Sequence, residues 1–304
     1  MATNNRIFYA VQSVAVCKTG FPPTAGASAN VAFLKGVQSV GITTNFTLEQ
    51  AFELGQVEIY ENSEDIADVE VTIEKLIDGE KLIYLSAVGN DGKTNVVSAS
   101  AKQCDVYLAI YADTNTSTSG QTPEKVVNCS GMYVSSISYT YPVDGNATES
   151  VTLVGNDKFW SDNIAGVIAD PKSSYGSPAT GTDGSDVPVS GIIRRNNVDV
   201  AGSTLPAEVT TQGPADSRHL QNISISADFG RENILELGRF GPYYKYATFP
   251  FEVTSEFEVI ATSGDLVSVS GNAENLTDRT IVIKDQAGTV IDLGTKNKLT
   301  SVSY

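Results

Sequence analysis

The chain is 304 residues long and strongly acidic, with a formal net charge of −16 and an isoelectric point near 4.4. A surface of this charge repels phosphate groups, which argues against direct recognition of nucleic acids or anionic membranes. The sequence has no run of about 18 apolar residues that would predict a membrane-spanning helix, and its N-terminus lacks the pattern of a signal peptide. Its length fits two domains of about 150 residues each.

Residues 1–35 are predicted to form an N-terminal arm or strand, with a connection rich in small residues and proline at 21–30. Cys17 lies in this arm, and Cys104 and Cys129 follow at wide spacing. Three cysteines without a C-x-x-C pair fit free thiols in a reducing compartment better than a disulfide scaffold.

A segment that occurs twice begins after this arm. Residues 37–56 and 220–239 match without a gap, so that equivalent positions lie 183 residues apart. The identical pairs include Phe46/Phe229, Glu53/Glu236, Leu54/Leu237 and Gly55/Gly238. Because the repeat is too long for a solenoid unit, it predicts two related domains in tandem. We expect domain A at 36–160, a linker or exposed loop rich in Gly, Ser and Pro at 161–215, and a shorter domain B at 216–304.

Both domains are predicted to be mainly β, because short stretches alternate apolar and polar residues or are rich in β-branched ones. Strands are expected at 69–76, 81–86, 106–111, 132–139 and 149–153, and in domain B at 221–226, 251–261, 266–270, 280–284 and 290–293. Helix is scarce. Residues 45–54 and 228–237 each fit a short helix or a structured loop, and 93–103 fit a second short helix.

Two of these strands form a long predicted hairpin at 133–153, because Asp144-Gly145 between them favours a turn with positive φ. The last part of domain A has a weak counterpart in domain B, where 296–304 aligns with 131–139 and then stops. Domain B therefore lacks a final strand, unless residues 1–32 or a neighbouring subunit supply it.

The repeated Glu-Leu-Gly elements have two interpretations. Glycine at the same place in both copies indicates a backbone conformation that other residues adopt poorly. That conformation fits a helix C-cap, and a subunit contact built twice is the alternative. The aromatic stretch 241–253 likewise fits either core packing or a subunit contact, since Tyr and Phe are enriched at interfaces.

Residues for catalysis or metal binding are not grouped in the sequence. His219 is the only histidine, and a general base needs partner groups. No cluster has zinc-ligand spacing, the segment 89–95 lacks the frame of a phosphate-binding loop, and the segment 113–120 lacks the last carboxylate of a calcium loop. Neighbouring carboxylates such as Glu64 and Asp65 fit a solvated acidic face. We expect no enzyme activity, cofactor or metal.

The residues 36–79, 133–160 and 225–259 resemble the tail tube proteins of tailed bacteriophages. The resemblance covers about half of the chain and contains no catalytic signature. It implies a small β-sandwich or barrel with a flanking helix, whose subunits form rings that close into a β-barrel and stack into a hollow tube. Such a virion protein would be assembled in the host cytoplasm and located in the tail.

In this interpretation the hairpin at 133–153 is part of the tube wall. Its candidate wall residues are Tyr133, Ile137, Tyr139, Asp144, Gly145, Val151 and Leu153. The eight residues of the Phe46/Phe229 and Glu-Leu-Gly pairs are the candidate assembly residues. Loops and termini would bridge stacked rings, and an acidic lumen would let DNA pass without binding it.

The resemblance implies that the chain itself is the main partner, with sheath, terminator or baseplate proteins as others. The duplication departs from the usual single tube domain and allows a ring of three or of six chains. A tail-completion or baseplate-adaptor protein of the same fold is an alternative. A secreted carbohydrate-binding β-sandwich is a second one, although it would need a signal peptide and more exposed tryptophan than Trp160 alone provides.

Overall fold

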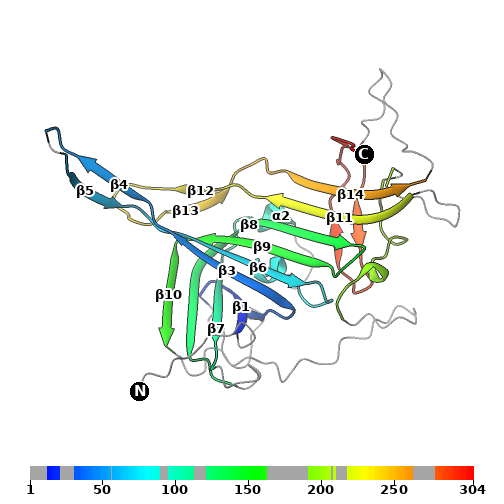
Figure 1. Ribbon diagram of the computed structural model, residues 1–304, viewed down its shortest axis with the longest axis horizontal. Helices are drawn as coiled ribbons and strands as arrows, with labels where there is room; N and C mark the ends of the chain where they lie inside the picture. The colour runs from blue at the N-terminus through cyan, green and yellow to red at the C-terminus, as the bar shows by residue number, and fades with distance from the viewer. Residues whose placement is uncertain are drawn as a thin grey trace.

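The computed structural model describes residues 12–20, 31–55, 57–89, 95–112, 121–162, 191–206, 208–209, 218–262 and 278–304. It is mainly β, and ten strands form one sheet that curls into a half-barrel (Figure 1). The predicted fold class is confirmed in this respect.

The sheet is organised around β8 (Lys125–Pro142), which is 18 residues long. The first half of β8 pairs with β7 (Cys104–Ile110) on one side and β10 (Asp157–Asp162) on the other. Its second half pairs with β9 (Thr148–Gly155) and β11 (Arg218–Asp228). Gly131 separates the halves with φ of +63°, and its N–H donates to Asp105 Oδ1 at 2.9 Å. Glycine at this irregularity lets the strand change direction.

Each half of β8 anchors a set of antiparallel strands. Beside the first half, β7 pairs with β1 (Gln12–Lys18), which pairs with β2 (Val31–Phe33). Beside the second half, β9 pairs with β6 (Asp68–Leu76), which pairs with β3 (Val37–Asn45). On the other side, β11 pairs with β14 (Val253–Ala261). The upper part of the sheet therefore has the order β3-β6-β9-β8-β11-β14.

The two segments of the repeat lie in this one upper sheet. β3 and β11 are each followed by a projecting hairpin and then by the partner strand, β6 or β14. The N-terminal strands β1 and β2 lie next to β7 and do not pair with β11 or β14. Residues 298–304, aligned in sequence with part of β8, form no strand.

The hairpins correct the expectation of a short helix or a structured loop at 45–54 and 228–237. The first hairpin consists of β4 (Leu48–Phe52) and β5 (Ile59–Glu64), and the second of β12 (Arg231–Ile234) and β13 (Tyr244–Ala247). Figure 1 shows both extending to the same side of the sheet. Every residue of β4 and β5 is exposed, so backbone pairing with a return strand fixes the conformation.

Most predicted strands are confirmed. β6, β7, β8 and β9 match the expectations in domain A, and β11, β14, β15 (Val282–Lys284) and β16 (Val290–Asp292) match those in domain B. The expected strand at 266–270 and the Gly-rich stretch 171–188 lie outside the described residues. The Asp144-Gly145 turn is confirmed, with φ of +127° at Gly145.

Helical segments are short in the described residues: α1 (Ile83–Ala87), α2 (Val96–Ala99) and the 3-10 turn η3 (Arg195–Asn197). The expected strand at 81–86 is wrong, because α1 occupies it, whereas α2 falls within the expected helix at 93–103. None of the helices in the described part of the chain is long and apolar enough to span a membrane.

A buried carboxylate explains why α1 forms. Glu149 on β9 is fully buried and accepts hydrogen bonds from the N–H groups of Ile83 and Tyr84, at 2.7 and 3.1 Å, and from the Tyr139 hydroxyl. These bonds satisfy donors at the start of α1 that the helix leaves unpaired. Burial raises the pKa of Glu149, and the hydrogen bonds and Lys75 partly oppose that shift.

We expect Glu149→Gln to lower the free energy of unfolding by about 1–3 kcal/mol, because an NH2 group replaces one of the two acceptor oxygens beside the buried N–H donors. The raised pKa means that the folded protein holds this proton more tightly than the unfolded chain. The contribution of Glu149 to stability is therefore greatest below its ordinary pKa near 4.5 and falls as the pH rises through the folded pKa. Urea unfolding of both proteins from pH 4 upward should show the wild-type advantage shrinking; an advantage that grows with pH would contradict this.

Candidate assembly surface

One face of the upper sheet is uncovered and polar. A row of directly opposed residues crosses all six strands: Ser39, Glu74, Ser150, Ser138, Ser226 and Thr254. All are half-buried or exposed. Ser39 Oγ donates to Glu74 Oε2 at 3.2 Å. The row is a continuous strip of hydroxyl and carboxylate groups.

The rows on either side are also mainly polar, apart from Gly41 and Leu76. One contains Gly41, Thr72, Thr152, Ser136 and Asp228, and the other contains Leu76, Thr148, Thr140, Ser224 and Glu256. The hydroxyls of Thr72 and Thr152 lie 3.4 Å apart. No lysine or arginine occupies any of the three rows, which we call the polar face. Without a cation it offers phosphate groups no ion pair, and its carboxylates repel them.

The opposite face of the same strands is the core. Alternation along each strand sends Val71, Ile73, Val151, Leu153, Ile223 and Ile225 to this side, where each is at most 3% exposed. Four of the candidate wall residues, Ile137, Tyr139, Val151 and Leu153, belong to this buried face, and Tyr133 is also buried. They face the core rather than the polar face, whereas Asp144 and Gly145 lie exposed at the turn.

The upper sheet ends in two strands that are each paired on one side only among the described residues. β3 pairs with β6, and β14 pairs with β11. An open edge exposes a row of N–H and C=O groups that can pair with a strand of another chain.

The Glu-Leu-Gly elements lie at the tips of the two hairpins. Leu54 and Leu237 are fully exposed, and Gly55 and Gly238 have φ of +97° and +87°. The sequence correctly indicated a positive φ, but the glycines serve hairpin turns rather than helix C-caps. Glu53 and Glu236 are exposed beside them.

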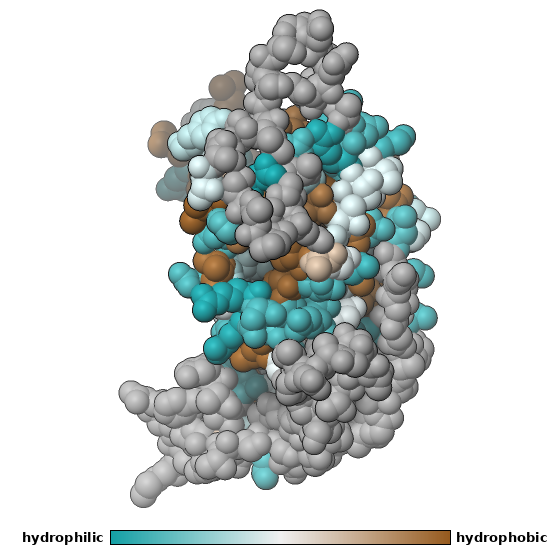
Figure 2. Space-filling model, turned by 90° about the vertical axis from the view of Figure 1, so that its right-hand side faces the viewer, coloured by the Kyte–Doolittle hydropathy of each residue, from teal (hydrophilic) through white to brown (hydrophobic). Residues whose placement is uncertain are grey.

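Exposed apolar side chains are concentrated on these hairpins. They are Phe46, Leu48, Phe52, Leu54, Val57, Ile59 and Tyr60 around the first hairpin, and Ile234, Leu235, Leu237, Phe240, Tyr243, Tyr246 and Phe249 around the second. At the opposite end of the molecule, Figure 2 shows the apolar residues scattered among polar ones. Two projections rich in exposed apolar groups are typical of a surface that another protein covers.

The aromatic stretch 241–253 divides between core and surface. Phe251 packs against the core with its ring 5.1 Å from that of Phe229. Tyr243 and Phe249 are 62% and 55% exposed. Each of the two interpretations of this stretch therefore fits part of it.

The described residues show little that could support catalysis. His219 is exposed on β11 opposite Ile260, and no group of His, Cys, Asp and Glu in the described part of the chain could hold a metal ion. Cys17, Cys104 and Cys129 are free and buried; burial raises the pKa of Cys17 to about 12 and that of Cys129 to about 11. The segment 113–120 and part of 89–95 lie outside the described residues.

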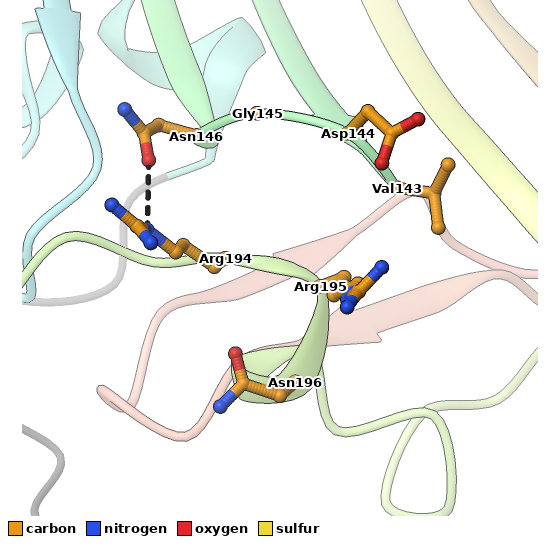
Figure 3. A pocket seen from close by; sticks show the side chains of 7 residues that line it. All are labelled: Val143, Asp144, Gly145, Asn146, Arg194, Arg195 and Asn196. Carbon is orange, nitrogen blue, oxygen red and sulfur yellow. Dashed lines mark hydrogen bonds between the residues drawn. The ribbon is translucent and has the colours of Figure 1, made fainter.

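A shallow hollow lies at the turn between β8 and β9, lined by Val143, Asp144, Gly145, Asn146, Arg194, Arg195 and Asn196 (Figure 3). Arg194 Nε donates to Asn146 Oδ1 at 3.1 Å, which ties the turn to the segment before η3. Arg194 and Arg195 are exposed. The hollow is open to solvent and lacks the enclosed apolar lining of a small-molecule site.

No protein-family model and no curated protein sequence matches the chain. Among solved structures, it is similar to the tube-terminating cap of the anti-feeding prophage, with 13% identity and a TM-score of 0.37 over 53% of this chain and 95% of that one. It is similar to a chain of the sheath-tube complex of the extracellular contractile injection system PVC, with 14% identity and a TM-score of 0.34 over 53% and 95%. Hcp1 from Salmonella typhimurium shows 15% identity and a TM-score of 0.26 over 52% and 98%.

We expect the double variant Leu54→Asp/Leu237→Asp to fold like the wild type and to self-associate less. Both side chains are fully exposed, so their replacement should change the free energy of unfolding by less than about 0.5 kcal/mol. Sedimentation velocity over a concentration series measures the association, and thermal unfolding is the control. Unchanged association would show that the hairpin tips are not a contact surface.

Proposed function

We propose that this chain is a structural subunit of a tube that conducts DNA, assembling into rings that stack. The observation that carries the proposal is the polar face, which runs between two open strand edges and contains no cation. If copies join edge to edge, the curled sheets continue one another around a ring. Polar faces on the inside of that ring form a lumen lined by hydroxyls and carboxylates.

Such a lumen suits the passage of DNA. Affinity for DNA comes mainly from lysine and arginine side chains that displace counterions from the phosphates. The polar face has none, so a duplex would meet repulsion and a layer of water rather than fixed contacts. This supports a conduit over a DNA-binding protein.

The hairpins with exposed apolar tips supply contacts between stacked rings in this proposal. Both extend to the same side of the sheet (Figure 1), so a ring would present them together toward its neighbour. The proposed location is the tail of a phage or phage-like particle, with a sheath, terminator or baseplate protein as further partners. The resemblance of the sequence to tail tube proteins supports this location.

Electron microscopy of the purified protein over a range of concentrations and salt tests the proposal. We expect rings or filaments of uniform diameter with an open centre, promoted by salt because screening weakens repulsion between chains of charge −16. The rotational symmetry of the end-on view tells three chains per ring from six. Single rings that never stack would indicate a tube-end adaptor, and a strictly monomeric protein at high concentration would refute the proposal.

Reversing the charge of the polar face should make the lumen retain DNA. In Glu74→Lys/Glu256→Lys/Glu258→Lys, two cations replace carboxylates of the polar face, and a third replaces Glu258, which follows on the same side of β14. We expect assembled tubes of this variant to protect short duplex DNA from nuclease, with protection falling as salt rises. Nuclease protection of the DNA is the measurement, and wild-type tubes should show none.

The matched control is Glu124→Lys/Asp278→Lys/Asp292→Lys, which makes the same change of charge at exposed positions outside both the polar face and the two hairpins. These tubes should bind DNA on the outside and leave it open to nuclease. Equal protection by both variants would show that the polar face does not line an enclosed passage.

A further inference from the structure

The same residue of the repeat has opposite environments in its two copies. Phe46 and Phe229 are equivalent, 183 positions apart. Phe229 is 0% exposed, and Phe46 is 74% exposed. An exposed phenylalanine in a segment that matches a buried one indicates a surface that lacks its cover.

The difference extends along the strand that leads to each phenylalanine. On β11 the inward-facing Ile223, Ile225 and Ala227 are 2%, 3% and 5% exposed. Their equivalents on β3, Val40, Ile42 and Thr44, are only half-buried. The whole inward stripe of β3 is therefore less covered than that of β11.

A neighbouring strand and the helix α1 explain this contrast. β11 pairs with β14 on one side and with the second half of β8 on the other. The Phe229 N–H donates to the Ser135 carbonyl of β8 at 2.8 Å. The Phe229 ring stacks on Tyr84 at 6.5 Å, and the Arg231 guanidinium lies 5.7 Å from it. β3, in contrast, pairs with β6 on one side and with no strand on the other among the described residues.

The direction of the strands shows what fits beside β3. The six strands of the upper sheet alternate in direction, so β3 and β14 at its two edges run antiparallel to each other. β14 of a second copy would therefore lie antiparallel to β3, just as β8 lies antiparallel to β11. The half-buried Phe257 and Val259 of β14 would then face the stripe of Val40 and Ile42.

On the basis of the proposed function, we infer that a second copy of this chain covers Phe46. The β14 edge of one copy adds alongside β3 of the next, and Phe46 becomes buried at this junction as Phe229 is buried within the chain. The contact is head to tail, so it can close into a ring. One repeated element thus serves once as core and once as subunit interface.

The variants Phe46→Ala and Phe229→Ala form a matched pair. We expect Phe46→Ala to leave the midpoint of thermal unfolding of the monomer unchanged and to raise the concentration needed for ring assembly at least about tenfold. Phe229→Ala should lower the unfolding midpoint by roughly 5–10 °C, because it leaves a cavity in the core. Phe46→Leu, which retains an apolar side chain, should restore most of the assembly.

Thiol reactivity measures the burial directly, because the three native cysteines are buried. Cysteine introduced by Phe46→Cys should react with a soluble thiol reagent in the monomer and be protected in rings. Cysteine introduced by Thr43→Cys, three residues away and exposed on the same side of β3 as the polar face, should react in both states because the centre of the ring is open to a small reagent. Both cysteine variants should also be made in the Leu54→Asp/Leu237→Asp protein, in which we expect rings that do not stack. Protection of Phe46→Cys in these rings would come from ring closure and not from contacts between rings.

Several results would overturn the inference. They are equal reactivity of Phe46→Cys in monomer and ring, protection that arises only on stacking, normal assembly of Phe46→Ala, or a loss of monomer stability in Phe46→Ala as large as in Phe229→Ala. Any of these with normal wild-type rings refutes the role of Phe46 and leaves the tube proposal standing. A wild type that forms no rings refutes both.

Discussion

Backbone pairing along β8 is the constraint on which the rest of the structure depends. Buried N–H and C=O groups must find partners, and this 18-residue strand finds them on both sides by engaging β7 and β10 with one half and β9 and β11 with the other. Because Gly131 changes the direction of β8 midway, the strands on its two halves form a curled sheet. The same pairing brings both segments of the sequence repeat into one sheet.

Two consequences follow from a single sheet that is covered on one face only. Side chains alternate across a strand, so the core on one side implies a regular polar surface on the other, here composed of hydroxyls and carboxylates. The sheet also ends in β3 and β14, whose outer backbone groups have no strand beside them among the described residues. Natural proteins usually protect such edges, and in our proposal each edge protects that of the next copy. Glu149 stabilises this arrangement from within by holding α1 against β9.

Local sequence patterns predicted where most strands lie, but not which of their side chains are buried in the folded protein. The alternation in β6, β8 and β9 and the Asp144-Gly145 turn are properties of short segments, so the sequence was sufficient for them. The polar face depends on register between distant strands, although Ser136, Ser138 and Thr140 at alternate positions were a signal that could have been found. The helix expectation at 45–54 failed because pairing with β5 across the hairpin overrides the capping pattern of the segment itself. Phe46 and Phe229 sit in similar local sequences, so only tertiary packing could distinguish them.

The central claim is that the polar face lines the lumen of a ring closed by β3 and β14. A reconstruction of the assembled protein by electron cryomicroscopy, at a resolution that separates strands, tests it most directly. The account predicts a continuous antiparallel wall in which β14 of each copy lies beside β3 of the next, with Glu74, Ser138 and Thr254 facing the central channel. A wall with these residues on the outside, or one in which β3 and β14 meet no strand of a neighbour, would contradict it.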